Sequence, residues 1–197
     1  MSGAGPAEQT LLRRGLRLEY LTLGWNVVGT VVVTLAALAV RSIALAGFGL
    51  DSLIEIFASI VVVWQLTGAT AGRERKALRL IGIAFVLLSL YILALSVLTL
   101  ASGHHPGTST GALIWLSLTV LLMLALAAGK RQTGNALGNL VLQTEARVTL
   151  MDAGLAAAVL VGIALNTAFG WWWADPLAGL VIVFYGAREG YAAWVGE

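Results

Sequence analysis

The sequence has no cysteine, only three prolines and two histidines, and only 11% charged residues in a chain of 197. The absence of cysteine excludes disulfide bonds and thiolate metal ligands. The scarcity of charge, with 59% hydrophobic residues and a mean hydropathy of +0.89, excludes an ordinary soluble domain. These features predict a polytopic membrane protein built of helices.

Long apolar runs follow a polar, basic N-terminal segment, residues 1–17, which we expect to be cytosolic. Each run has about 18 residues or more, the length that a transmembrane helix needs. The predicted fold is therefore all-α, a bundle of six transmembrane helices with no soluble domain. The predicted spans are 18–40, 42–66, 77–100, 111–128, 136–165 and 174–194.

Basic residues gather on one side of these spans. An even number of spans places both termini on the same side, and every lysine and arginine except Arg41 falls there. Because cytoplasmic loops are rich in lysine and arginine, this distribution predicts cytosolic termini and a location in the plasma (inner) membrane. Lys130 is assigned to the cytosolic connection between the fourth and fifth spans. The basic cluster 73–76 suits anionic lipid rather than nucleic acid.

Asp51 and Glu55 lie one helical turn apart inside the second span, which places their Cβ atoms ~5–6 Å apart on one face. A charged side chain near the bilayer centre costs at least ~2.5–3.5 kcal/mol. Two such acids must share a proton, take a basic partner or bind a cation. We expect no lysine or arginine at the same depth, and a purely structural pair is therefore the less favoured interpretation.

A third acid, Asp152, is expected at the same depth in the fifth span. At ~1.5 Å per residue, Glu55 lies ~20 Å below the outer end of its span and Asp152 lies ~20 Å below Leu165. The candidate metal ligands are therefore Asp51, Glu55 and Asp152, near the midplane.

Two further polar residues are candidates for a supporting role. Glu145 is expected at the cytosolic interface, either as a solvated acid or partner of Arg147, or as a residue that attracts cations to the entrance. Asn26 belongs to a stripe of polar residues that recurs every fourth position in the first span. The stripe favours interhelical hydrogen bonding, and a hydrated path to the acids is the alternative. Its members are Thr22, Asn26, Thr30 and Thr34.

Three segments give the chain a resemblance to the cation diffusion facilitator (cation efflux) family over all six spans. Residues 42–55 resemble the second helix of that family, residues 144–152 its fifth helix, and residues 173–176 the start of its sixth. The resemblance implies six helices, a midplane site for a divalent metal and export in exchange for protons, usually by a homodimer.

Two features depart from the family pattern. Val148 stands where the zinc transporters of the family have His or Asp, four residues before Asp152. The remaining set of three carboxylates is harder than a usual zinc site, so Zn²⁺ is the first candidate and Mn²⁺ or Fe²⁺ are alternatives. Water, Thr149 or a backbone carbonyl is expected to complete the shell. The chain ends just after the sixth span, so we expect a homodimer to form within the membrane.

We therefore expect a secondary transporter that exports a divalent cation against protons, with no catalytic residue and no cofactor. An exporter of small organic cations is one alternative, and it would need an aromatic-lined pocket. The other alternative is an accessory or metal-responsive membrane subunit that moves nothing by itself. An enzyme is the least favoured reading, because buried carboxylates alone would have to carry the catalysis.

Overall fold

The computed structural model describes residues 5–40, 43–68, 71–103 and 110–195, and these residues form helices and short connections without a strand. Five of the helices are long and apolar enough to cross a membrane. The prediction of an all-α, polytopic membrane fold is therefore confirmed. The helices are α1 (Pro6–Val40), α2 (Ile43–Leu66), α3 (Ala71–Ser102), α4 (Thr110–Leu137), α5 (Leu140–Phe169) and α6 (Ala174–Val195).

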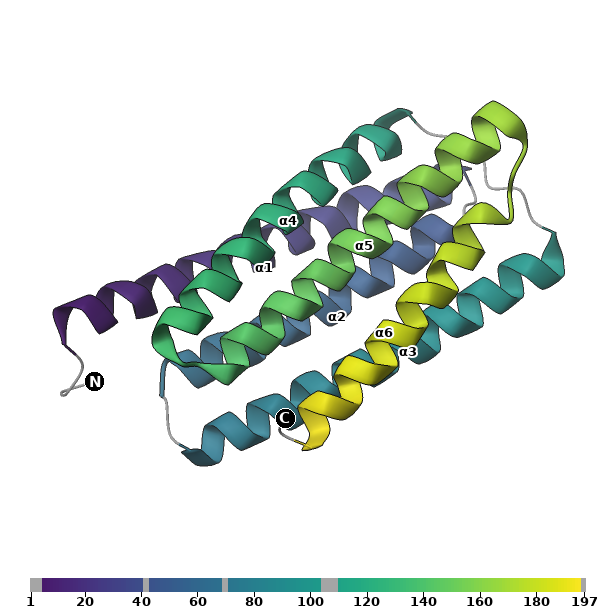
Figure 1. Cartoon of the computed structure of the whole chain (residues 1–197). Coiled ribbons are helices and arrows are strands. Elements are labelled where there is room, and N and C mark those ends of the chain that lie inside the picture. The colour runs from purple at the N-terminus through teal and green to yellow at the C-terminus, as the bar shows by residue number, and fades with distance from the viewer. Residues whose placement is uncertain (1–4, 41–42, 69–70, 104–109, 196–197) are drawn as a thin grey trace.

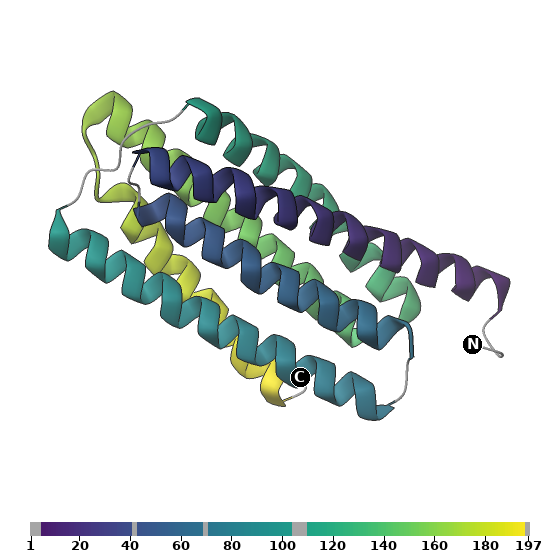
Figure 2. The same cartoon turned by 180° about the vertical axis from the view of Figure 1, so that it is seen from behind.

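The helices pack chiefly in pairs: α1 with α2, α4 with α5, and α3 with α6. Figures 1 and 2 show α1 and α4 along one side of the bundle, α3 and α6 along the opposite side, and α2 and α5 between them. Side chains on the inner faces of α2 and α5 are therefore enclosed by the other helices. The predicted acid-bearing spans occupy this central position.

Several helices extend beyond the predicted spans. α1 begins at Pro6 rather than near residue 18, and proline suits the first turn of a helix because its missing N–H has no partner to lose there. α4 continues to Leu137, nine residues beyond the predicted end at residue 128. This extension places Lys130 inside a helix and not in a connecting loop.

A tight turn joins α4 to α5. Gly138 has a φ of +61°, and the N–H groups of Gly138 and Asn139 donate to the carbonyls of Asn135 (3.2 Å) and Gly134 (2.9 Å). This is the Schellman pattern that ends a helix. Asn139 then caps α5, because its Oδ1 accepts from the N–H of Leu142 at 2.9 Å. Two adjacent residues thus stop one helix and start the next.

Replacing Asn139 by alanine is expected to lower the free energy of unfolding by about 1 kcal/mol, because α5 loses its cap. The substitution also removes the hydrogen bond from Asn139 Nδ2 to Gln65 Oε1 (3.2 Å). The measurement is thermal unfolding of the purified protein in detergent. Asn135→Ala, at an exposed position in the same turn, is the matched control, and equal losses in both variants would contradict the assigned cap.

Two clusters of buried apolar side chains lie on either side of a polar layer, which contains Asp51, Glu55 and Asp152. On α2, Asp51 and Glu55 lie between Phe48, which belongs to one cluster, and Ala58, which belongs to the other. On α5, Asp152 lies between the same two clusters. Apolar side chains therefore separate the polar layer from both ends of the bundle.

Candidate functional site

Among the described residues, the buried charged side chains form one group in the bundle interior. All of them are at most 2% exposed, and they come from α1, α2, α4 and α5. Five are acids and one is a base. The members are Glu19, Asp51, Glu55, Lys130, Glu145 and Asp152.

Asp51 and Asp152 form the first part of this group. Their carboxyl groups face each other across α2 and α5 at a separation that allows one to hydrogen-bond to the other when a proton is present. As two carboxylates they are acceptors only, and Asp51 Oδ2 and both oxygens of Asp152 have no donor among the described residues. The pair therefore needs a proton or a metal cation between its oxygens.

Glu55 lies beside this pair and connects it to the second part of the group. Its Oε1 accepts a hydrogen bond of 2.6 Å from the hydroxyl of Thr149, while Oε2 is buried and no described residue donates to it. Asp152 is close enough to Glu55 to repel it electrostatically. One oxygen of Glu55 is therefore held by the protein, and the other remains available to a cation.

Lys130 forms the centre of the second part. Its Nζ donates to Glu145 Oε1 at 3.0 Å and to Thr149 Oγ1 at 2.9 Å, and it forms an ion pair with Glu19 Oε2 at 3.1 Å. The ammonium thus has three oxygen partners, two as hydrogen-bond acceptors and the third as an ion pair.

Two expectations from the sequence are corrected by this arrangement. Lys130 is not a loop residue, because the longer α4 carries it into the bundle, and a basic partner for the buried acids therefore exists. Glu145 is neither solvated nor directed to the interface, because it is fully buried and paired with Lys130. Thr149, named as one group that could complete a metal shell, bridges Lys130 and Glu55 with its hydroxyl.

The other two residues singled out in the sequence, Asn26 and Val148, are both buried. The amide nitrogen of Asn26 donates to the carbonyl of Thr22 in its own helix at 3.1 Å, and Thr22 and Thr30 likewise donate to carbonyls of α1. These hydrogen bonds lie within the helix, not between helices as the stripe predicted. Val148 is buried in the apolar cluster that contains Phe85 and Leu142. The position that carries a ligand in zinc-transporting relatives therefore contributes only packing here.

The three predicted ligands are neighbours without forming a closed cage. In the described part of the chain, no three His, Asp or Glu side chains converge closely enough to hold a metal ion as they stand. Asp51 and Asp152 are paired, and Glu55 is adjacent but turned to Thr149. A cation that binds all three would therefore have to draw Glu55 Oε2 toward the aspartate pair.

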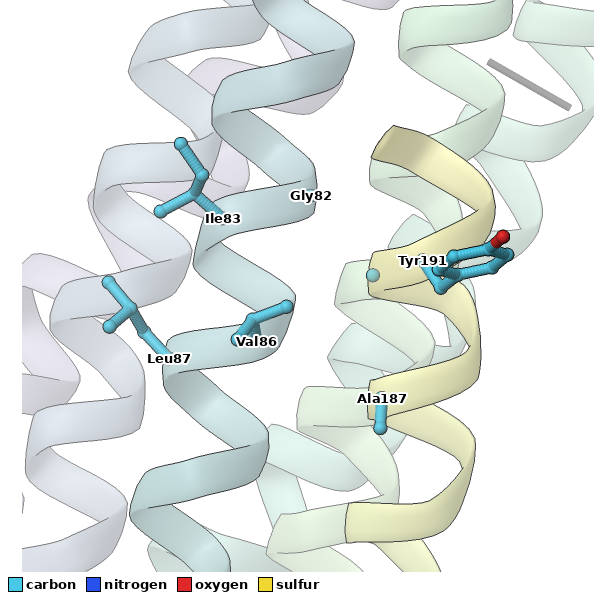
Figure 3. A pocket seen from close by; sticks show the side chains of 7 residues that line it. Gly82, Ile83, Val86, Leu87, Ala187 and Tyr191 are labelled. Atoms are coloured by element: carbon cyan, nitrogen blue, oxygen red, sulfur yellow. The ribbon is translucent and has the colours of Figure 1, made fainter. Parts of the chain in front are cut away.

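A separate groove of about 420 Å³ lies on the surface between α3 and α6. Its lining is apolar and includes none of the buried acids, and Figure 3 shows Val86 and Ala187 on the two helices, with Tyr191 at its rim. A Cβ added to Gly190 would lie 3.2 Å from the carbonyl of Gly82, so the glycine permits the close packing of the two helices. The groove offers no charge to a cation and is not the candidate site.

Sequence reasoning missed Lys130 and Glu19 as members of the buried group. The signal for Lys130 was present in Gly138-Asn139, because this pair marks a hairpin in which Lys130, eight residues before Gly138, lies level with Glu145, seven residues after it. Glu19 carried no such signal, since only the packing of α1 against α4 brings it to Lys130.

Comparison with known proteins agrees with this architecture. Over 189 residues the chain is 27% identical to transmembrane protein 163 of Xenopus laevis, an alignment that covers 87% of this chain and 66% of the relative. The chain thus spans just under two thirds of the length of that protein. Residues 77–193, more than half of the chain, match the model of the cation efflux transmembrane domain. The chain therefore belongs to the cation efflux family, which is a family of transporters and not of enzymes.

Proposed function

We propose that this protein exports a divalent transition-metal cation from the cytosol in exchange for protons, and that Asp51, Glu55 and Asp152 bind the cation. The observation that carries the proposal is the buried pair of Asp51 and Asp152, which face each other beside Glu55. Asp51 Oδ2, both Asp152 carboxyl oxygens and Glu55 Oε2 have no donor among the described residues. Membership in the cation efflux family supports it.

The charge balance of the site favours exchange with protons. Without a metal, three neighbouring carboxylates in an apolar interior cannot all remain ionised, and the aspartate pair holds at least one proton. A divalent cation needs the ionised forms, so its binding must release protons. Metal and protons therefore occupy the same oxygens in alternation, which is the requirement for antiport.

The donor set defines the class of metal. The three proposed ligands offer only carboxylate oxygens. Neither a side chain at position 148, where the residue is an apolar valine, nor a cysteine, which the chain lacks, adds a nitrogen or sulfur ligand. Oxygen ligands suit Mn²⁺ and Fe²⁺ as well as Zn²⁺. Zn²⁺ remains the first candidate on the family resemblance, and Mn²⁺ or Fe²⁺ are the alternatives.

Transport requires that the polar layer open to each side in turn. In this structure the acids are at most 2% exposed, between two apolar clusters. Rearrangement of the helices around the site, as in alternating access, would expose it first to the cytosol and then to the outside. Cytosolic termini, a location in the plasma membrane and a homodimer within the bilayer belong to the same proposal and rest on the charge distribution and the family.

The test is metal-driven proton flux through the purified protein in liposomes that contain a pH indicator. We expect Zn²⁺, Mn²⁺ or Fe²⁺ added on one side to drive protons out of the opposite compartment toward that side, and empty liposomes to show no flux. Apparent metal affinity should fall as the pH falls, because protons compete for the carboxylates. Folded protein that moves no metal would contradict the proposal and favour an accessory subunit. Flux driven by an organic cation alone would favour the other alternative.

A further inference from the structure

We propose that Glu19, Glu145 and Thr149 form a second cation site in the bundle, and that the ammonium of Lys130 is its permanent occupant. The inference goes beyond the proposed metal site, and its test can fail independently. It concerns the part of the buried group that the proposed transport does not use.

The surroundings of the Lys130 ammonium are those of a bound cation. Its Nζ has oxygen partners at 3.1 Å in Glu19, 3.0 Å in Glu145 and 2.9 Å in Thr149, which come from two different helices. All three side chains are fully buried. Carboxylate and hydroxyl oxygens are also the ligands that hard divalent cations take.

This site retains binding capacity that Lys130 does not use. Glu145 Oε2 is buried and has no hydrogen-bond donor in the described part of the chain, and the hydroxyl of Ser59 donates to Glu145 Oε1 at 3.3 Å. One ammonium faces two carboxylates, so the site would carry a net charge of −1 with both acids ionised. A divalent cation in place of the ammonium would neutralise the two carboxylates.

The two parts of the buried group have similar ligands and different occupants. Asp51 and Asp152 are two acids from facing helices with no basic residue between them, whereas Glu19 and Glu145 are two acids with Lys130 between them. Thr149 joins the two parts, since it accepts from Lys130 and donates to Glu55. The protein thus fills one acidic site with its own cation and leaves the adjacent one open to a metal.

The experiment counts metal ions bound to the purified full-length chain in detergent, with Zn²⁺ and Mn²⁺ as probes. We expect one metal per chain in the wild type and two in Lys130→Ala. The substitution removes four heavy atoms from a fully buried side chain, more space than the ~30 Å³ share of one water. The variant that combines Lys130→Ala with Glu19→Gln and Glu145→Gln should return to one.

A fourth variant separates the two sites. Lys130→Ala combined with Asp51→Asn should bind one metal, held by Glu19 and Glu145. A wild type that binds none would contradict the proposed function, and this double variant would still report on the second site. Folded Lys130→Ala with the same metal count as the wild type would overturn the inference. Lys130→Ala that stays unfolded even when purified with the metal would overturn it too, because a site that accepts a cation is stabilised by it.

Discussion

Replacing Asp152 by asparagine is expected to weaken binding of the divalent metal more than about 100-fold, since even partners of metal ligands are worth about 10–100-fold. Asparagine keeps the volume and one oxygen of the side chain but removes the charge. Asp51→Asn should have a similar effect, because Asp51 and Asp152 face each other and a cation between them needs both carboxylates. The measurement is titration with Zn²⁺ and Mn²⁺ in competition with a metal indicator at constant pH.

The matched control is Glu19→Gln, the same carboxylate-to-amide change in the same buried group. Glu19 pairs with Lys130 and is not a proposed ligand of the transported metal, so this variant should stay within about tenfold of the wild type, the lower limit for loss of a ligand's partner. Unfolding is a separate readout. Asp152→Asn should unfold in metal-free buffer no earlier than the wild type, because the asparagine amide can donate to Asp51 in place of the proton that the aspartate pair shares. Folded Asp152→Asn protein that binds metal like the wild type would exclude Asp152 as a ligand.

Counting residues along the helices placed Asp152 level with Glu55, because a helix rises a fixed ~1.5 Å per residue. The contacts of Asp152 extend one turn further along α2, to Asp51. The structure brings Asp51 and Asp152 into a pair. Their role as metal ligands stays a prediction, since neither the fold nor the family match measures a bound ion.

The sequence did not reveal the surroundings of Lys130, for a physical reason. The positive-inside rule counts lysines near span ends, and it cannot distinguish one that faces lipid headgroups from one that faces the bundle. Lys130 lies seven residues before the end of α4, about 10 Å along the helix, where either direction is open to it. Two buried acids on α1 and α5 decide the direction, and only tertiary packing brings them there.

The loop assignment of Lys130 also affected the interpretation of Thr149. With Lys130 assigned to a loop, the hydroxyl of Thr149 was free to be a metal ligand. With Lys130 in the bundle, that hydroxyl accepts from the ammonium and so directs its own proton to Glu55 Oε1. Thr149 is therefore best understood as a positioning residue that leaves Glu55 Oε2 for the metal.

Replacing Lys130 by methionine is expected to lower the free energy of unfolding by about 3–5 kcal/mol, the usual cost of removing one partner from a buried ion pair. Methionine nearly fills the space of the lysine side chain, so the loss reports on charge and not on a cavity. It leaves Glu19 and Glu145 buried together without a base. Unfolding in detergent, followed by loss of helical signal with increasing temperature or denaturant, measures the effect.

Adding Glu19→Gln and Glu145→Gln to Lys130→Met should restore most of that stability, because a neutral set of similar volume is often as stable as the ion pairs it replaces. If the triple variant is as unstable as Lys130→Met, the loss comes from packing of the side chain and the ion pairs contribute little. Recovery would show that the pairs are not needed for folding as such. Their presence would then be explained by what they exclude: a second metal in an acidic core whose proposed metal ligands are Asp51, Glu55 and Asp152.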